Sequence, residues 1–393
     1  MPGAVEDTLR ADWHYPTAMR VGAGRLAELP ECCRRLGMSA PLLVTDPGLA
    51  ELPFVEAARE SCEEAGLRCQ VFSDLQPNPR GVDVEKGVAA LREGSHDGVI
   101  ALGGGSALDA GKAIALMAGQ RRPLFDFVDE GDNWQRANPA GIMPVVAVPT
   151  TAGTGSEVGR ASVITDEAAR LKRIIFHPAM MPGTVILDPE LCVSLPRHIT
   201  AATGMDALSH NLEALCAPSF HPMAEGIALE GMRLVQQHLE KACSDGGDIE
   251  ARTGMLIASS MGATAFQRGL GGMHALAHPL GARYGAHHGL LNAVLMPYVL
   301  AANMTAIEDI LARAARYLDL PGHSAGSFMD WVLGLRERIE IPYQLSEADI
   351  HDGEAGLIGE LAVQDPSAGG NPIPFDASEY TNIFVNAVHG RLG

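Results

Sequence analysis

Between about residues 40 and 190 the sequence alternates short apolar runs with segments of helical apolar spacing. The apolar runs have the length of strands and lack polar alternation, which is typical of parallel strands buried on both faces. The expected strands are PLLVTD (41–46), LRCQVFSD (67–74), DGVIALGGG (97–105), MPVVAVPTT (143–151) and TVILDP (184–189). Helical segments such as 49–66 and 82–94 lie between them. This pattern predicts an α/β domain with a parallel sheet.

The second half of the chain has a different pattern. After about residue 197 the strand-like runs disappear, and long segments with helical spacing follow, such as 221–243 and 248–267. Pro196 is a suitable junction. A chain of 393 residues is long enough for two domains. We therefore expect an α/β domain over residues 1–197 and an all-helical domain over residues 198–393.

Charge and cysteine content restrict the partners and the compartment. The net charge of -19 disfavours nucleic acid and anionic membranes as partners. No basic segment followed by an apolar run opens the chain, and no uninterrupted apolar stretch of spanning length is evident, so neither export nor membrane insertion is expected. The seven cysteines are odd in number and form no C-x-x-C pair, which argues against a disulfide framework or a thiolate metal site and favours the cytoplasm. They are Cys32, Cys33, Cys62, Cys69, Cys192, Cys216 and Cys243.

A glycine turn follows the expected strand at 97–105 and opens a helix, in GGGSALDAGK. Free backbone N–H groups at such a turn can bind a phosphate. The spacing is not the dinucleotide fingerprint, because Leu108 takes the place of the last glycine, and not a Walker loop, because Lys112 is not followed by Ser or Thr. A plain strand-to-helix turn is therefore an equally good interpretation of Gly103, Gly104 and Gly105.

Two other strand ends add polar groups to this interpretation. The stretch VAVPTTAGTGSEVGR supplies Thr150, Thr151, Thr154 and Ser156. Open parallel sheets bind ligands at the carboxyl ends of their strands, so both loops are expected to line one nucleotide site. Asp46 ends another strand and is suited to accept a hydrogen bond from a ribose hydroxyl, although it is equally suited to cap the following helix.

Metal-ligand residue types gather in the helical half. In TAATGMDALSHNLEA, Asp206 and His210 lie four residues apart and hence on one helix face. A buried carboxylate there needs a compensating charge, and a metal ion is the leading explanation. GMHALAHPLGARYGAHHG adds His274 and His278, also four residues apart, with His287 or His288 in reserve. No glutamate follows His274, so the segment is not the zinc protease motif H-E-x-x-H.

Taken in order, GGGSALDAGK, PTTAGTGSEV, TAATGMDALSHNLEA and HALAHPLGARYGAHHG closely resemble motifs of the iron-containing (group III) alcohol dehydrogenase family, over nearly the whole chain. The resemblance implies a dinucleotide-binding parallel-sheet domain followed by an all-α metal-binding domain, the dehydroquinate synthase-like fold. It also implies a metal held by Asp206, His210, His274 and His288. His278 then belongs to the proton path rather than to the ligands. His287 occupies a position often taken by another residue, and either a role in supporting the ligands or a merely structural role is expected for it.

The resemblance also implies an NAD site. Asp46 matches the acid that favours NAD over NADP, although Pro47 is not the commonest residue after it. The other matching positions follow the glycine turn and the threonine-rich loop. They are Gly104, Gly105, Ser106, Asp109, Thr150, Thr151 and Lys172, with Thr154 and Ser156 added from the same loop. In SAGGNPIPF, Ile373 replaces an arginine common in the family, so no role of that arginine is carried over.

The function expected is a metal-dependent, NAD(H)-linked alcohol dehydrogenase or aldehyde reductase. The resemblance favours Fe(II), with Zn(II) as the alternative because such ligands bind it more tightly. It also implies a homodimer or larger homo-oligomer. Arg283 or Arg160 would favour an ω-hydroxy acid such as 4-hydroxybutyrate if it faced the substrate, whereas solvent exposure or pairing with an acid would carry no such meaning. The rival functions are a glycerol dehydrogenase or dehydroquinate-synthase-like enzyme, a metal-dependent hydrolase and a non-catalytic scaffold.

Overall fold

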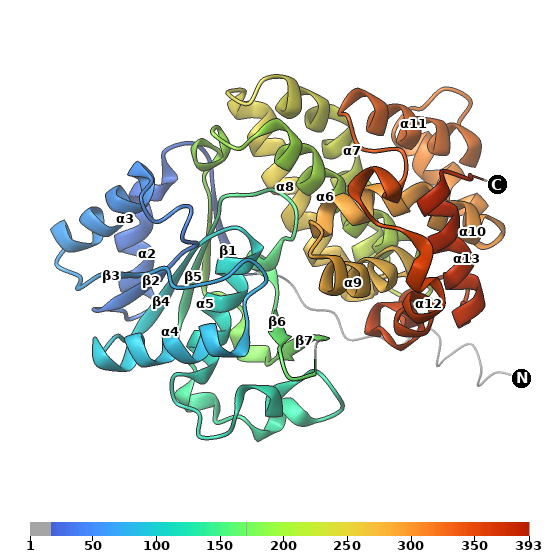
Figure 1. Cartoon of the computed structure of the whole chain (residues 1–393). Coiled ribbons are helices and arrows are strands. Elements are labelled where there is room, and N and C mark those ends of the chain that lie inside the picture. The colour runs from blue at the N-terminus through green and yellow to red at the C-terminus, as the bar shows by residue number, and fades with distance from the viewer. Residues whose placement is uncertain (1–16, 170, 393) are drawn as a thin grey trace, which may run out of the picture. The chain divides into compact units, whose positions relative to one another are not determined.

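The computed structural model describes residues 17–169 and 171–392. These residues form two compact units that meet in sequence between Ser194 and Leu195. In Figure 1 the strands belong to the blue and green part of the chain, and the yellow to red part is helical. The α/β class of the first half and the helical class of the second are thereby confirmed.

The first unit contains a parallel six-stranded sheet in the order β1-β8-β5-β4-β2-β3. Its strands are β1 (Ala18–Val21), β2 (Pro41–Val44), β3 (Gln70–Phe72), β4 (Gly98–Gly103), β5 (Val145–Pro149) and β8 (Thr184–Leu187). Five of the six lie within the runs expected from the sequence. The edge strand β1 was not expected, because its four residues are only partly buried and show no apolar run.

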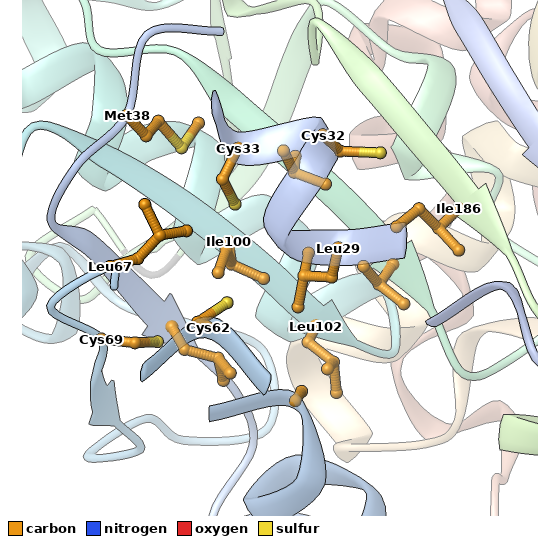
Figure 2. Packing of buried hydrophobic residues seen from close by; sticks show 14 of the residues in the cluster. Leu29, Cys32, Cys33, Met38, Cys62, Leu67, Cys69, Ile100, Leu102 and Ile186 are labelled. Carbon is orange, nitrogen blue, oxygen red and sulfur yellow. The ribbon is translucent and has the colours of Figure 1, made fainter. Parts of the chain in front are cut away.

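Helices cover both faces of this sheet. They are α2 (Leu29–Arg35), α3 (Pro53–Glu64), α4 (Gly81–Glu93) and α5 (Gly105–Met117). Successive strand residues point to opposite faces. Ile100 and Leu102 of β4 accordingly pack with α2 and α3, as Figure 2 shows, whereas Ala101 lies against Gly111 of α5. The near-continuous apolar runs of the sequence thus reflect strands covered on both sides.

Cysteines contribute to the layer under α2 and α3. Cys33, Cys62 and Cys69 lie in one apolar cluster (Figure 2) and are at most 5% exposed. All seven cysteines of the chain are buried free thiols. In these positions they act as small apolar side chains.

A second, two-stranded sheet was not expected from the sequence. Strands β6 (Ala161–Asp166) and β7 (Leu171–Phe176) pair antiparallel. Buried and half-buried residues alternate along β6. This is the pattern of a strand with one covered face. Such a strand has no continuous apolar run in its sequence, and the hairpin was therefore not expected.

Lys112 of α5 ties this hairpin to the main sheet. Its side chain is only 1% exposed, and its Nζ donates to the carbonyl oxygens of Ser156, at 2.8 Å, and of Ala161. Its Nζ also lies 3.3 Å from Oδ1 of Asp109. Burial lowers the pKa of Lys112, and the Asp109 carboxylate opposes that shift.

The second unit is built from helices, and among residues 195–392 no strand is found. The helices are α6 (Arg197–Cys216), α7 (Pro222–Ser244), α8 (Ile249–Ala265), α9 (Gly272–Tyr284), α10 (His288–Tyr317), α11 (Ala325–Arg338), α12 (Ala355–Gln364) and α13 (Ala377–His389). Helix α6 lies at the centre, in contact with α7, α8 and α10. Every residue from Thr200 to Cys216 is buried, which is the burial of a core helix rather than of an amphipathic surface helix.

Helix α10 is long and apolar enough to span a membrane by length and composition alone, with a mean hydropathy of 1.6 over its best window. This differs from the expectation that the sequence has no apolar stretch of spanning length. However, 67% of that window is buried inside the unit, and buried core helices of folded domains meet the same criterion.

Replacing Lys112 by Met is expected to lower the free energy of unfolding by about 3 kcal/mol, because it leaves the partly buried Asp109 without its cation. The control is Lys86→Met, since Lys86 forms only an exposed pair with Asp74. That change is expected to cost less than about 1 kcal/mol. Urea unfolding followed by circular dichroism measures both. Equal shifts in the two variants would contradict the structural role of Lys112.

Candidate metal centre and cofactor-binding turn

Four side chains that the sequence nominated as metal ligands converge in the helical unit. Asp206 and His210 lie one turn apart on α6, His274 is on the first turn of α9, and His288 is the first residue of α10. One ligand atom from each lies within 4.8 Å of the others. The first three residues are buried, and the His288 side chain is 25% exposed. His288 is therefore the most exposed of the four candidate ligands.

Close packing of α10 on α6 brings His288 to this point. A Cβ at position 289 would lie 2.4 Å from the carbonyl oxygen of Ala202 and 3.1 Å from Cβ of Asp206. Only glycine fits against the neighbouring backbone at this distance. The close contact between α10 and α6 thus explains why glycine follows His288 directly.

The charge of Asp206 is compensated from several sides. Burial alone would raise the pKa of this carboxyl, but His210, His288 and His274 outweigh it and lower the pKa to about 2. Asn292 of α10 donates from Nδ2 to Oδ1 of Asp206 at 2.8 Å. The same nitrogen lies 3.1 Å from Nε2 of His274 and 3.2 Å from Nε2 of His288. Asp206 is an anion among imidazoles, as a ligand of a cation should be.

Sequence reasoning missed Glu213, which lies behind His274. Its Oε2 is 2.6 Å from Nδ1 of His274, and the Glu213 side chain is 5% exposed. Burial lowers the pKa of His274, but Glu213 and Asp206 outweigh it, and the net shift is upward. A signal was available, because Glu213 follows Asp206 by two helical turns in the same quoted motif.

His278 lies beside the four converging residues but is not one of them. Its ring stacks on that of His288 with centroids 5.4 Å apart. Its Nδ1 is 2.8 Å from Oδ2 of Asp365, a second carboxylate that sequence reasoning missed. Burial raises the pKa of Asp365, but His278 and Ser367 outweigh it, and the pKa is lowered. Asp365 is 87 residues away in sequence, so no local spacing announces the pair.

His287 and Ile373 lie outside the cluster. His287 is the N-cap residue of α10, where its Nδ1 accepts from the backbone N–H of Leu290 at 3.4 Å. Ile373 contributes its backbone oxygen, which accepts from Nδ2 of Asn371 at 2.7 Å.

Each arginine singled out by the sequence has a partner within its own unit. Arg283 pairs with Glu354, its Nε lying 2.8 Å from Oε2, and both side chains are exposed. Nine residues of α-helix turn through about 900°, so Arg283 points to the side of α9 opposite His274. Arg160, in the first unit, lies over the ring of Phe176 at 5.6 Å. The alternative in which Arg283 pairs with an acid is the one observed.

In the first unit, Asp46 and the threonine-rich loop surround the glycine turn that joins β4 to α5. Burial raises the pKa of Asp46, and hydrogen bonds from the backbone N–H groups of Gly104 and of Asp46 itself oppose the shift. A Cβ at Gly104 would lie 3.6 Å from Oγ1 of Thr151, and a Cβ at Gly105 would lie 2.7 Å from Cγ2 of Thr154. Asp46 does not cap a helix, because α3 starts at Pro53 with Leu52 as its N-cap.

The remaining residues that the sequence predicts for the cofactor site lie on α5, in the loop after β5 and on β7. Ser106 lies half-buried in the first turn of α5, and Thr150 is buried, with its N–H bonded to the carbonyl of Gly103. The Asp109 carboxylate accepts from Oγ of Ser156 at 2.5 Å and from the N–H of Val163 at 3.0 Å. Asp109 and Ser156 thus bond to each other. Lys172 lies on β7 and donates to Oδ1 of Asn78 at 2.8 Å.

Comparison with known proteins identifies the family. Residues 16–189 match the model of the iron-containing alcohol dehydrogenases, and residues 200–388 match that of the C-terminal part of the same family. The chain belongs to the iron-containing alcohol dehydrogenase family. The family expected from the sequence motifs is thereby confirmed.

Individual members of the family match over almost their full length. A 4-hydroxybutyrate dehydrogenase of Cupriavidus necator is 38% identical over 386 residues, which cover 95% of this chain and 99% of that protein. An NAD-dependent methanol dehydrogenase of Bacillus methanolicus is 34% identical, with 96% and 100% coverage. The crystal structure of a 1,3-propanediol oxidoreductase superposes with a TM-score of 0.92 at 33% identity, covering 96% of this chain and 100% of that one.

The donor set suits the metal of an iron-containing alcohol dehydrogenase. One carboxylate and three imidazoles are ligands that divalent iron and zinc both accept. The low pKa of Asp206 keeps its carboxylate ionised. Residues that converge within 4.8 Å, three of them buried, fit a single ion.

Proposed function

We propose that this enzyme is an NAD(H)-linked alcohol dehydrogenase that acts on a small primary alcohol, and that it works as an aldehyde reductase in the reverse direction. The four converging residues hold a divalent metal ion, Fe(II) or Zn(II). These are Asp206, His210, His274 and His288. The observation that carries the proposal is this convergence in a chain of the iron-containing family. Membership of that family disfavours a hydrolase, and a complete donor set disfavours a non-catalytic scaffold.

Each bound group supplies one kind of chemistry. A divalent metal at this site supplies Lewis acidity toward the oxygen of an alcohol or aldehyde. NAD supplies the acceptor for the hydride that leaves the alcohol carbon. The side chains of this chain bind and orient these groups and move the remaining proton.

His278 is the residue we assign to the proton. Since a carboxylate only accepts hydrogen bonds, Nδ1 of His278 carries the proton that it shares with Asp365. Nε2 is then free of hydrogen and can accept the alcohol proton in the oxidative direction. The side chain is 19% exposed, which gives the proton a route to solvent.

The glycine turn is the proposed binding site of NAD. Gly105 and Ser106 offer backbone N–H groups to the pyrophosphate at the start of α5, and Gly104, which has no side chain, lets the pyrophosphate come close to the backbone. Asp46, beside Gly104, is suited to the ribose hydroxyls. Thr150, Thr151 and Thr154 supply hydroxyl groups around the turn. The hydrogen bond between Ser156 and Asp109 holds the threonine-rich loop to α5. Lys172 is the last residue assigned to the NAD site.

The domain assignment and the assembly belong to the same proposal. Residues 1–197 form the NAD-binding domain, and residues 198–393 form the metal-binding and catalytic domain. The buried free thiols support a reducing compartment, the cytoplasm. The family resemblance supports a homodimer or larger homo-oligomer.

The substrate proposal is a short primary alcohol, with 4-hydroxybutyrate as the acid to be tested first. The 38% identity to a 4-hydroxybutyrate dehydrogenase supports this choice. The pairing of Arg283 with Glu354 does not. A neutral alcohol of the same length is therefore the necessary comparison.

The test is NADH oxidation by metal-free protein and by protein reconstituted anaerobically with Fe(II) or with Zn(II). The aldehydes are butanal and succinic semialdehyde. We expect turnover only with metal, and loss of turnover with retained NADH binding in Asp206→Ala and His274→Ala. Undiminished turnover by metal-free protein, or by either variant, would refute the metal centre.

Asp365→Asn is expected to lower kcat by at least about tenfold, because His278 loses the anion that fixes its tautomer. Metal content and the Kd for NADH should not change. The matched control is Asp352→Asn, which removes a carboxylate 2.8 Å from an exposed histidine, His389. Unchanged kcat in Asp365→Asn would count against the role of His278.

Asp46→Asn is expected to raise kcat/KM for NADP relative to NAD by about tenfold, or about 1.4 kcal/mol, since the carboxylate repels the 2′-phosphate. The control is Asp74→Asn, because Asp74 follows the neighbouring strand β3 and is exposed. Steady-state kinetics with both dinucleotides provide the comparison. The same ratio in Asp46→Asn and in the unaltered enzyme would place the ribose elsewhere.

A further inference from the structure

The first turn of α9 is held by side chains from elsewhere in the helical unit. The N-cap residue Gly271 has no side chain, so the helix cannot cap itself. The N–H of Gly271 donates to Oε2 of Glu213 at 2.8 Å, and the N–H of Met273 donates to Oε1 at 2.7 Å. The N–H of Gly272 donates to Oδ1 of Asn371 at 2.9 Å. Glu213 and Asn371 thus share the backbone of one helix end.

Of the two side chains that hold this helix end, Glu213 also contacts the imidazole of His274. Its Oε2 accepts from Nδ1 of His274 at 2.6 Å, which is short for such a bond and typical of a charged acceptor. An ionised carboxylate has no proton to donate, so the proton of a neutral His274 must sit on Nδ1. Nε2 then carries the lone pair that a metal ion needs.

The opposite side of the ring is consistent with this assignment. Nδ2 of Asn292 faces Oδ1 of Asp206 at 2.8 Å and must be a donor there. The same amide nitrogen is 3.1 Å from Nε2 of His274. A ring nitrogen facing a donor carries no proton itself.

We propose that Glu213 is a positioning residue that fixes both the tautomer of His274 and the helix end that carries it, so that Nε2 is delivered unprotonated to the metal centre. This inference rests on the proposed metal site. One buried carboxylate joins three N–H groups, two from the backbone and one from the imidazole. A carboxylate that only capped the helix would not need the third.

The first experiment compares two variants that each weaken the same helix end. Glu213→Gln keeps the size of the side chain but turns one acceptor oxygen into a donor and removes the charge. Asn371→Ala removes the bond to Gly272 without touching the imidazole. Zn(II) and Co(II) affinities are measured by competition with a chelator, alongside thermal unfolding of the metal-free proteins.

We expect Glu213→Gln to weaken metal binding by about 10- to 100-fold, the usual range for a residue that orients a ligand. Asn371→Ala should lower the unfolding temperature but change metal affinity by less than about threefold. Equal losses of affinity in the two variants would reduce Glu213 to a helix cap, and unchanged affinity in Glu213→Gln would overturn the proposal. An unaltered protein that binds no metal would instead refute the proposed function.

A second measurement does not depend on the folding of the glutamate variant. Nitrogen-15 NMR of the unaltered, metal-free protein, at a pH where its imidazoles are neutral, reports the tautomer of each histidine. The signals of His274 are assigned by their absence in His274→Gln. We expect the proton on Nδ1, and a proton on Nε2 would overturn the proposal.

Discussion

A buried carboxylate governs the arrangement of the helical unit. Asp206 is 2% exposed inside a helix that is buried on all sides, and an uncompensated charge there costs several kcal/mol. The compensating groups come from three helices, with His210 on α6 itself, His274 on α9 and His288 on α10. Their helices must therefore meet at one point. The glycine at 289, which allows backbone contact between α10 and α6, is a consequence of that requirement.

Two histidines one turn apart on α9 have different surroundings because different carboxylates lie behind them. Glu213 holds Nδ1 of His274, and Asp365 holds Nδ1 of His278. When the imidazole is neutral, each carboxylate holds its proton on Nδ1 and leaves Nε2 without one. His274 is 1% exposed and directed at Asp206, whereas His278 is 19% exposed and outside the converging set. Both histidines are paired with a carboxylate in the same way. Their burial and their other neighbours make His274 a candidate metal ligand and His278 a candidate for proton transfer.

This division explains which parts of the site could be predicted from the sequence. Strands covered on both faces and a helix buried all round leave periodic patterns, so the two fold classes were predictable. The spacing of His274 and His278 was equally compatible with two ligands. Only the resemblance to the iron-containing family separated them. Asp365 could not be found, because a contact across 87 residues leaves no spacing to detect. The hairpin β6–β7 and the edge strand β1 were missed because half-exposed strands lack a continuous apolar run.

The position of Arg283 limits how far it can select an acidic substrate. Helical geometry turns it about 180° away from His274, and its guanidinium is paired with Glu354. Both side chains of that pair are exposed, 38% and 43%, so solvent screens the attraction between them. A substrate carboxylate that recruited Arg283 would exchange one exposed pair for another and gain little. A large preference for a hydroxy acid over the neutral alcohol would thus have to come from a cation in a more buried position than Arg283.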